Sequence, residues 1–306
     1  MLCLRRILAV WVALGWMAVT LSGQETQPSR PEISANQLVR ETVAREVDAA
    51  NAPSEHYMFR SDRQTPKGSQ TKLYVETHDA MAGMVIANNG QPLSPQQHQA
   101  EIDRLNWLAG NTEQLKKKHA REKEDADRTL RIVKALPDAF TYKYAGTEPG
   151  TADMGKVGDE LVKLTFVPNP AFSPPSKVEE TLRGMQGSLL IDTNAHRIAL
   201  IDGTLFRDVS FGWGIIGRLD KGGHFIVKQA DVGNGTWDLT NMNLKITGKI
   251  LVFKSIGMIS DETFSDFHAV PNDLTFAKGV DLLRAEQEKL AHNHDAESSD
   301  AKKNLR

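Results

Sequence analysis

Residues 212–217 (GWGIIG) match the spacing G-x-G-x-x-G of a dinucleotide-binding loop. That chemistry requires a helix that opens at the third glycine, so that its N-terminus faces the pyrophosphate. Gly222 and Gly223 follow closely, and strand-like runs lie on both sides, so the sequence leaves no room for such a helix. The glycines of this run are better explained by a local role. They can form a bulge or bend in a strand, or allow another backbone or a ligand to come close.

Hydrolytic and metal chemistry have little support in the sequence. Ser265, Asp266 and His268 are residue types of a catalytic triad, but a triad is recognised by geometry, and we expect these three to form a surface turn. No G-x-S-x-G or H-E-x-x-H motif occurs, and the nine histidines are dispersed. The sequence therefore predicts no enzyme activity, no metal site and no cofactor.

Large apolar side chains recur at comparable places in successive strand-like runs of the C-terminal half. If they converge on one face of a curled sheet, they form either a core packed under a helix or a pocket for an acyl chain. We treat them as candidate lining of an apolar cavity, with simple core packing as the alternative. The candidates are Phe211, Trp213, Ile215, Phe225, Trp237 and Phe253.

The N-terminal residues predict export. Arg5 and Arg6 precede an uncharged apolar run over residues 7–21, and small residues follow up to Gly23. This is the pattern of a secretory signal peptide, and the run is short for a membrane span. We expect cleavage after about residue 23, with retention as an anchor as the alternative.

Composition narrows the class of the mature protein. The single cysteine lies in the leader, so the mature chain has no disulfide and its stability must come from core burial. Apolar residues make up 40% of the 306 residues and charged residues 25%, which is typical of a globular protein. A net charge of −2 without a concentrated basic face argues against nucleic-acid binding.

The N-terminal half combines helices with short strands. Residues 24–33 are expected to be a flexible linker, and Ser34 begins an amphipathic helix. A helical excursion over residues 94–136 starts with Ser94 before a proline, and its charged middle (KKKHAREKEDADR) predicts a solvated helix with ion pairs one turn apart. A movable lid or partner-binding arm is the alternative for this helix.

The C-terminal half predicts an antiparallel sheet. Short alternating runs follow one another from Phe140 to Ile259, with Gly and Asn turns at intervals of about ten residues and no crossover helices. We expect an α+β fold in which residues 34–291 form one domain around a curled antiparallel sheet, an unclosed β half-barrel with packed helices. Residues 292–306 are expected to be a polar tail.

Residues 172–267 resemble the LolA and LppX superfamily of periplasmic lipoprotein and lipid carriers. The resemblance is carried by MQGSLLIDT (185–193), RIAL (197–200), the W-x-L strand at 237–239 and the closing strand 249–254. It implies an unclosed antiparallel barrel with helices on its concave side and a hydrophobic cavity for acyl chains. It implies neither enzyme activity nor a cofactor.

Together these features predict a non-enzymatic protein of the periplasm or cell envelope, or an extracellular one where no outer membrane exists. Its expected ligand is a lipid or the acyl chains of a lipoprotein. The alternative is an envelope scaffold or protein-interaction module with a filled core, which uses the charged helix 112–136 as its contact surface. An envelope protein partner is compatible with both functions, and integral membrane insertion after processing is not expected.

Overall fold

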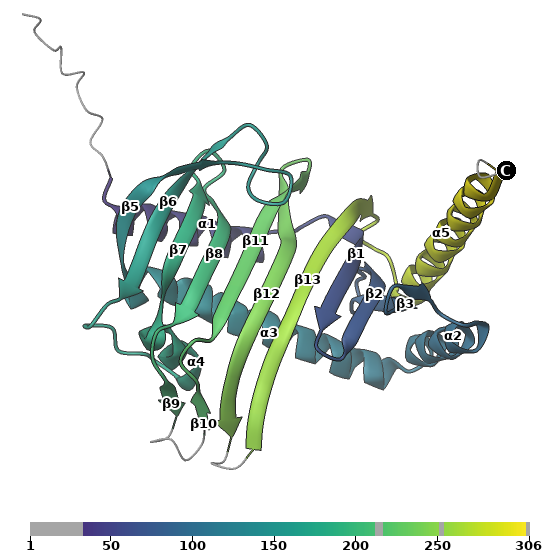
Figure 1. Ribbon diagram of the computed structural model, residues 1–306, viewed down its shortest axis with the longest axis horizontal. Coiled ribbons are helices and arrows are strands. Elements are labelled where there is room, and N and C mark those ends of the chain that lie inside the picture. The colour runs from purple at the N-terminus through teal and green to yellow at the C-terminus, as the bar shows by residue number, and fades with distance from the viewer. Residues whose placement is uncertain (1–32, 212–216, 251–253, 304–306) are drawn as a thin grey trace, which may run out of the picture. The chain divides into compact units, whose positions relative to one another are not determined.

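The alternating runs form the strands of one large sheet in the computed structural model, which describes residues 33–211, 217–250 and 254–303 (Figure 1). The predicted leader and nearly all of the linker lie outside these residues. Residues 34–306 make up one compact unit. In chain order the elements are α1 (Ala35–Asn51), β1 (His56–Thr65), β2 (Gly68–Val75), β3 (Ala82–Asn88), β4 (Gln91–Pro92), α2 (Pro95–Ala109), α3 (Thr112–Ala139), β5 (Phe140–Pro149), β6 (Glu160–Pro168), α4 (Lys177–Glu180), the 3-10 helix η1 (Thr181–Gly184), β7 (Met185–Asp192), β8 (Arg197–Leu205), β9 (Val209–Phe211), β10 (Gly217–Leu219), β11 (His224–Gly233), β12 (Thr236–Ile250), β13 (Lys254–Val270) and α5 (Phe276–Lys303).

The sheet has 13 strands, and its main path runs β4-β3-β2-β1-β13-β12-β11-β8-β7-β6-β5. The small β9–β10 hairpin joins it through β12. Every pairing between named strands is antiparallel, and the path ends at β4 and β5 without closing. The predicted fold class, an α+β fold around an unclosed curled antiparallel sheet, is confirmed.

The helix starts follow from local capping chemistry. The Ser34 side chain accepts a hydrogen bond from the Gln37 amide at 3.2 Å, and Ser94 forms a reciprocal capping box with Gln97 ahead of Pro95. Each cap satisfies amide groups that have no partner inside the helix. The two N-caps expected from the sequence are therefore present.

Cross-strand register defines two faces of the sheet, because residues directly opposite each other point to the same side. We call the face that carries Leu189 and Ile201 the inner face, and the opposite one the outer face. Residues that pair in turn across neighbouring strands therefore share the inner face: Ile201 of β8, Val227 of β11, Met242 of β12, Glu262 of β13 and Arg63 of β1.

The main hydrophobic core lies on the inner face of β5 to β8. In Figure 1, α1 and α3 pass behind these strands, and α4 lies at their lower end. The helices contribute Leu38, Val39 and Leu136, and the strands contribute Phe140 and Ile191, all buried. This core buries one face of the sheet under a partial helical layer.

A second core lies on the outer face at the other end of the sheet. Leu73 and Met84 of β2 and β3 pack there against Leu105 of α2 and Phe276 and Leu283 of α5. Ser61 lies two residues before Arg63 in β1 and therefore shares the inner face, and so does its partner Lys72 of β2. Leu73 is the next residue after Lys72, so its side chain points to the outer face, and the two cores lie on opposite faces of the sheet. The sheet is thus covered on different sides at its two ends.

Helix α3 joins the two cores. Its first turn places Leu115 against the second core, and its last turns place Val133 and Leu136 in the first. The helix between them carries ion pairs one turn apart: Glu113–Lys117, Lys118–Glu122, Lys123–Asp127, Glu124–Arg128 and Asp125–Arg128. The predicted solvated helix with paired charges is confirmed, and its charge pattern is that of a solvent-bridging helix.

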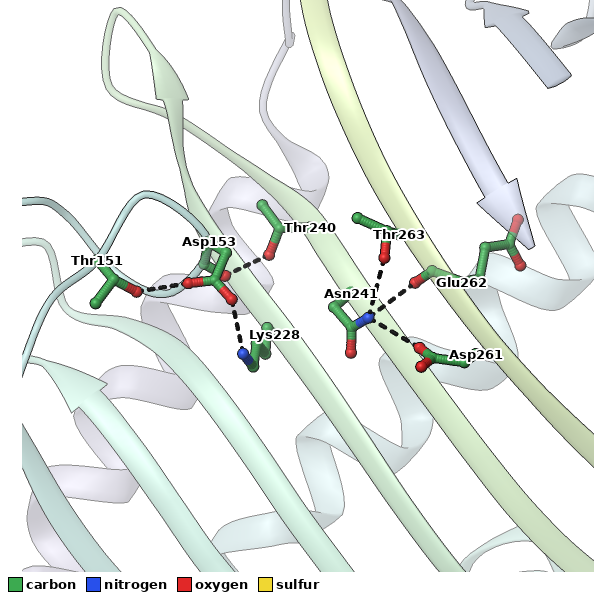
Figure 2. Close-up of polar contacts among 8 residues, drawn as sticks. All are labelled: Thr151, Asp153, Lys228, Thr240, Asn241, Asp261, Glu262 and Thr263. Carbon is green, nitrogen blue, oxygen red and sulfur yellow. Dashed lines mark hydrogen bonds and ion pairs between the residues drawn. The ribbon is translucent and has the colours of Figure 1, made fainter. Parts of the chain in front are cut away.

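The loop between β5 and β6 is fastened to the sheet by polar contacts. Figure 2 shows Asp153 between Thr151, at 2.6 Å, and the Lys228 ammonium, at 2.7 Å, while its carbonyl accepts from Thr240. On the neighbouring strands, the amide of Asn241 donates to oxygens of Asp261, Glu262 and Thr263. These contacts hold β11, β12 and β13 together on the face where the loop lies.

Helix α5 is an element that the sequence analysis did not predict. It begins at Phe276 and continues to Lys303, so residues 292–303, expected to be part of a polar tail, are helical. Apolar residues at Phe276, Val280 and Leu283 give it the spacing of a buried helical stripe. Docking on β2 and β3 fixes the start of this helix.

Side chains from helices satisfy backbone groups at both edges of the sheet. At the β5 edge, the Asn36 amide donates to the Phe140 carbonyl at 3.3 Å and accepts from the Tyr142 amide at 3.2 Å. At the β3 edge, Arg104 donates to the Gly83 carbonyl at 2.7 Å, and Glu101 accepts from the Val85 amide at 2.8 Å. Blocking an edge in this way opposes pairing with another chain.

We predict that Asn36→Ala lowers the free energy of unfolding by about 1–2 kcal/mol, because two backbone groups of β5 lose their partner. Urea denaturation of the purified protein measures this change. Asn51→Ala is the matched control, since the Asn51 amide donates only to the Val47 carbonyl at the exposed end of α1. Equal losses in both variants would show that the edge contact carries no special weight.

Candidate ligand-binding cavity

An apolar cavity of about 330 Å³ lies between the inner face of the sheet and the helices. Strands β5 to β8, β11 and β12 form its floor, and the last turns of α3 with α4 and η1 form its opposite wall. Of its 14 lining residues, only Tyr142 and Thr181 carry a hydroxyl group, and the other side chains are apolar. They are Ile132, Val133, Leu136, Phe140, Tyr142, Phe166, Val178, Thr181, Leu182, Met185, Leu189, Ile201, Phe225 and Ile246.

The aromatic end of the cavity is rigidly packed. The rings of Phe140 and Phe166 lie 4.5 Å apart between centroids, and Tyr142 packs at 6.2 Å from each. The Tyr142 hydroxyl donates to the Leu136 carbonyl at 2.9 Å, which ties β5 to the end of α3. Burial raises the pKa of Tyr142, so the hydroxyl stays neutral at physiological pH.

The cavity therefore carries no charge among its lining residues. Its one buried hydroxyl on the aromatic wall already has an acceptor, and a polar ligand would find little to bond with there. A volume near the lower end of the usual range of about 300–1,000 Å³ suits a small apolar group or a segment of an acyl chain. Burying such a group gains about 25 cal/mol per Å² of apolar surface.

The six residues that the sequence analysis proposed as cavity lining do not all lie at the cavity. Phe225 lines the cavity. Trp237 packs instead on a small cluster with Leu190 and Ala199, and the Arg197 guanidinium lies 5.6 Å from its ring centroid. Phe211 lies in β9 opposite Gly217, and Trp213, Ile215 and Phe253 lie outside the described residues.

Most of the lining was missed by the sequence analysis, although a signal for part of it was present. Ile132, Val133 and Leu136 stand at helical spacing at the end of a charged helix, and Leu189 and Ile201 stand in alternating strands. Val178 and Leu182 come from the two short helical segments α4 and η1. Which of these residues face one another depends on how α3 and α4 cross the sheet, and the sequence does not encode this locally.

The residues considered for other chemistry do not assemble a centre. Gly217 begins strand β10 rather than a helix. Ser265, Asp266 and His268 lie in β13 around an irregularity where Asp266 has φ of 56°, not in the surface turn that was expected. Within the described ranges, no group of three or more metal-ligating side chains occurs.

A buried carboxyl group lies at the end of β7, away from the cavity. Asp192 is fully buried, and one of its oxygens accepts from the backbone amides of Asn194 at 3.0 Å and Ala195 at 2.9 Å. Its other oxygen has no hydrogen-bond partner among the described residues. Burial first, and the neighbouring Asp159 carboxyl next, raise the pKa of Asp192.

The helical excursion is only partly free to act as a contact surface. The middle of α3 is exposed, and Trp107 of α2 is 56% exposed. The end of α3 is part of the main core and of the cavity wall, because Leu136 is buried and Val133 lines the cavity. Deleting residues 94–136 would therefore remove part of the core and not only a surface arm.

Comparisons with known proteins give matches by structure alone. No family model and no curated protein sequence matches the chain. The fold is similar to an outer membrane lipoprotein-sorting protein domain from Vibrio parahaemolyticus, with 9% identity and a TM-score of 0.29 over 79% of this chain and 96% of that chain. It is also similar to a DUF1329 family protein from Desulfovibrio piger, with 8% identity and a TM-score of 0.26 over 80% of this chain and 96% of that chain.

Superpositions at these TM-scores do not align a site, so the ligand must be argued from the residues of this chain. Among the helices that the structure describes, none has the length and hydropathy needed to cross a bilayer.

We predict that Asp192→Asn stabilises the protein at neutral pH by about 1 kcal/mol. The raised pKa means that the folded state binds a proton more readily than the unfolded state, so the contribution of Asp192 is present at low pH and is lost as the pH rises through its folded pKa. Asparagine keeps the acceptor oxygen and cannot ionise. The variant should therefore gain on the wild type in urea denaturation as the pH rises from about 4, the ordinary pKa of an aspartate, through the raised folded pKa of Asp192.

The exposed Asp273 provides the matched control. Asp273→Asn controls for the loss of one carboxylate at an exposed position, and the gain of Asp192→Asn is measured relative to it. A gain of Asp192→Asn that does not change with pH would contradict the assignment of a destabilising buried charge.

Proposed function

We propose that this protein is an exported, non-enzymatic carrier or sensor that binds a lipid or an acylated ligand through its hydrocarbon chain. The observation that carries the proposal is the uncharged cavity of about 330 Å³ between the sheet and the α3 and α4 helices. Water inside an apolar cavity finds few hydrogen-bond partners, so such a cavity favours an apolar occupant. A hydrocarbon chain is therefore its natural ligand.

The proposal also places the protein in the periplasm or cell envelope. This part is supported by the signal-peptide pattern of residues 1–23, which belong to the undescribed N-terminus. In an aqueous envelope compartment, a carrier must hide a chain that would otherwise drive aggregation or membrane insertion. A cavity covered by helices on the inner face meets that need.

We predict that Ile201→Trp weakens binding of an environment-sensitive fluorescent fatty acid at least about tenfold, because the indole fills part of the cavity. Fluorescence titration of the purified protein measures the affinity. Ile226→Trp is the matched control: Ile226 follows Phe225 in β11, so its side chain points to the outer face.

Two outcomes would contradict the proposal. One is a wild-type protein that does not bind the fatty acid at any concentration below its micelle-forming range. The other is equal weakening by the inner-face and outer-face substitutions, which would place the chain elsewhere.

The exposed part of the helical excursion favours a second candidate function, contact with an envelope protein. Trp107, 56% exposed, lies on α2 close to the turn that leads into α3. Large aromatic residues are enriched at protein interfaces.

If this surface binds a partner, Trp107→Ser should abolish a complex isolated by cross-linking in cells that express the protein, while the fatty-acid affinity stays unchanged. Asp103→Ser is the matched control, because Asp103 is exposed, lies one turn earlier on α2 and bonds only within this helix, to Gln99. Asn106 is not used because its side chain accepts a hydrogen bond from Arg284 of α5. A complex that survives Trp107→Ser would exclude this surface as the contact.

A further inference from the structure

The two ends of the strands differ in charge. One end carries the β9–β10 hairpin and the free ends of β12 and β13, at the bottom of Figure 1, together with the β1–β2 and β10–β11 turns. We call it the basic end and define it as residues 64–69, 206–209, 217–223, 244–249 and 255–260. Two carboxylates lie in these segments, Asp208 and Asp220. The cationic side chains are Lys67, Arg207, Arg218, Lys221, Lys245 and Lys249.

The opposite end of the strands has the reverse balance. It is formed by the β5–β6 loop, the β7–β8 turn and the β11–β12 turn, within residues 150–160, 192–197 and 231–238. Its only cations are Lys156 and Arg197. The carboxyl groups are Asp153, Asp159, Glu160, Asp192, Asp231 and Asp238. The net charge of −2 conceals this asymmetry, because the fold gathers the cations of the basic end from separate segments of the chain.

Most cations of the basic end have no anionic partner within the protein. The Arg218 guanidinium lies 3.5 Å from the Asp208 carboxylate and 3.1 Å from that of Asp220, so one arginine serves both carboxylates. The other five cations are exposed, and none of them forms an ion pair with a residue in the described part of the chain. A group of unpaired cations at one pole attracts an extended anionic surface.

Strands β12 and β13 continue past their neighbours as a two-stranded ribbon at this end. Pairing of β11 with β12 stops at Lys245, and pairing of β1 with β13 stops at Asp261. Beyond these residues the two strands pair with each other, and only the short strand β10 joins them. The ribbon therefore projects from the main body of the sheet.

The ribbon exposes large apolar side chains beside its lysines. Met258 is 55% exposed and Ile259 is 43% exposed, and as neighbours in a strand they point to opposite faces. Ile259 pairs directly with Lys245, which lies on the same face. Apolar side chains next to cations are the combination by which proteins bind the interface of an anionic bilayer.

The ribbon is also continuous with the wall of the apolar cavity. Ile246 lines the cavity, and Met258 is its cross-strand partner, so both side chains lie on the inner face. Apolar surface thus extends from the cavity lining to an exposed side chain at the basic end.

We propose that the basic end docks on the surface of a bilayer that contains anionic phospholipids. The exposed lysines contact the headgroups, and Met258 and Ile259 enter the interfacial layer. The proposal deepens the proposed function and rests on it, because it names the surface with which the cavity exchanges a hydrocarbon chain. A bilayer fits better than a purely ionic partner, since the lysines stand beside exposed apolar side chains.

Co-sedimentation of the purified protein with vesicles tests the docking. We expect binding to vesicles of phosphatidylcholine and phosphatidylglycerol to be at least about tenfold tighter than binding to phosphatidylcholine alone at low salt. The double variant Lys245→Gln/Lys249→Gln should weaken binding to the anionic vesicles about tenfold. Met258→Ser should weaken it about fivefold, because the apolar contact is lost.

The matched controls carry the same changes elsewhere. Lys116→Gln/Lys278→Gln removes two exposed lysines of α3 and α5, and Val157→Ser removes an exposed apolar side chain at the opposite end of the strands. Both should bind the anionic vesicles as the wild type does. Equal weakening by the test and control lysine pairs would overturn the assignment to the basic end.

Two further results would overturn the proposal. One is a wild type that binds neither kind of vesicle, or both equally. The other is binding that depends on Lys245 and Lys249 but is unchanged in Met258→Ser, which would indicate a purely ionic partner. The fatty-acid titration of the same proteins is independent of vesicles: a wild type that binds the fatty acid but no vesicle loses only the docking surface, and one that binds no fatty acid loses the proposed function.

Discussion

The inner face of β5 to β12 is a broad apolar surface that must be kept from water, and every other feature of this half of the molecule follows from how it is covered. Helices α1, α3 and α4 cover it, and the main core forms where they pack on β5 to β8. Where Leu182 stands opposite Phe225, neither layer fills the space, and the apolar cavity is the result. Its lack of charge is a direct consequence of being built from two core-facing surfaces.

The same constraint explains why α3 is long and charged. The β1 to β3 end of the sheet buries its outer face under α2 and α5, so the chain must pass from one core to the other after α2. A helix of 28 residues, about 42 Å long, makes this passage. Only its ends carry apolar contacts, and ion pairs such as Lys118–Glu122 hold its solvated middle in helical form.

The architecture could be predicted from local patterns, but the site could not. Alternation and Gly/Asn turns identified the antiparallel strands, and Ser34 and Ser94 marked helix starts. Phe225 and Trp237 occupy similar places in the neighbouring strands β11 and β12, yet a register shift at Lys228/Gln229 interrupts the alternation that would relate their faces. The helical side of the cavity depends on non-local crossing of α3 and α4, which no periodicity reveals.

The most direct test of an open apolar cavity is a crystal structure of the protein grown with a fatty acid brominated near the end of its chain. The account predicts an anomalous bromine peak between Phe225 of the sheet and Leu182 of the helical wall. A structure in which the helical wall has closed onto the sheet, with the cavity filled by the protein's own side chains and no bromine beside Phe225, would contradict it.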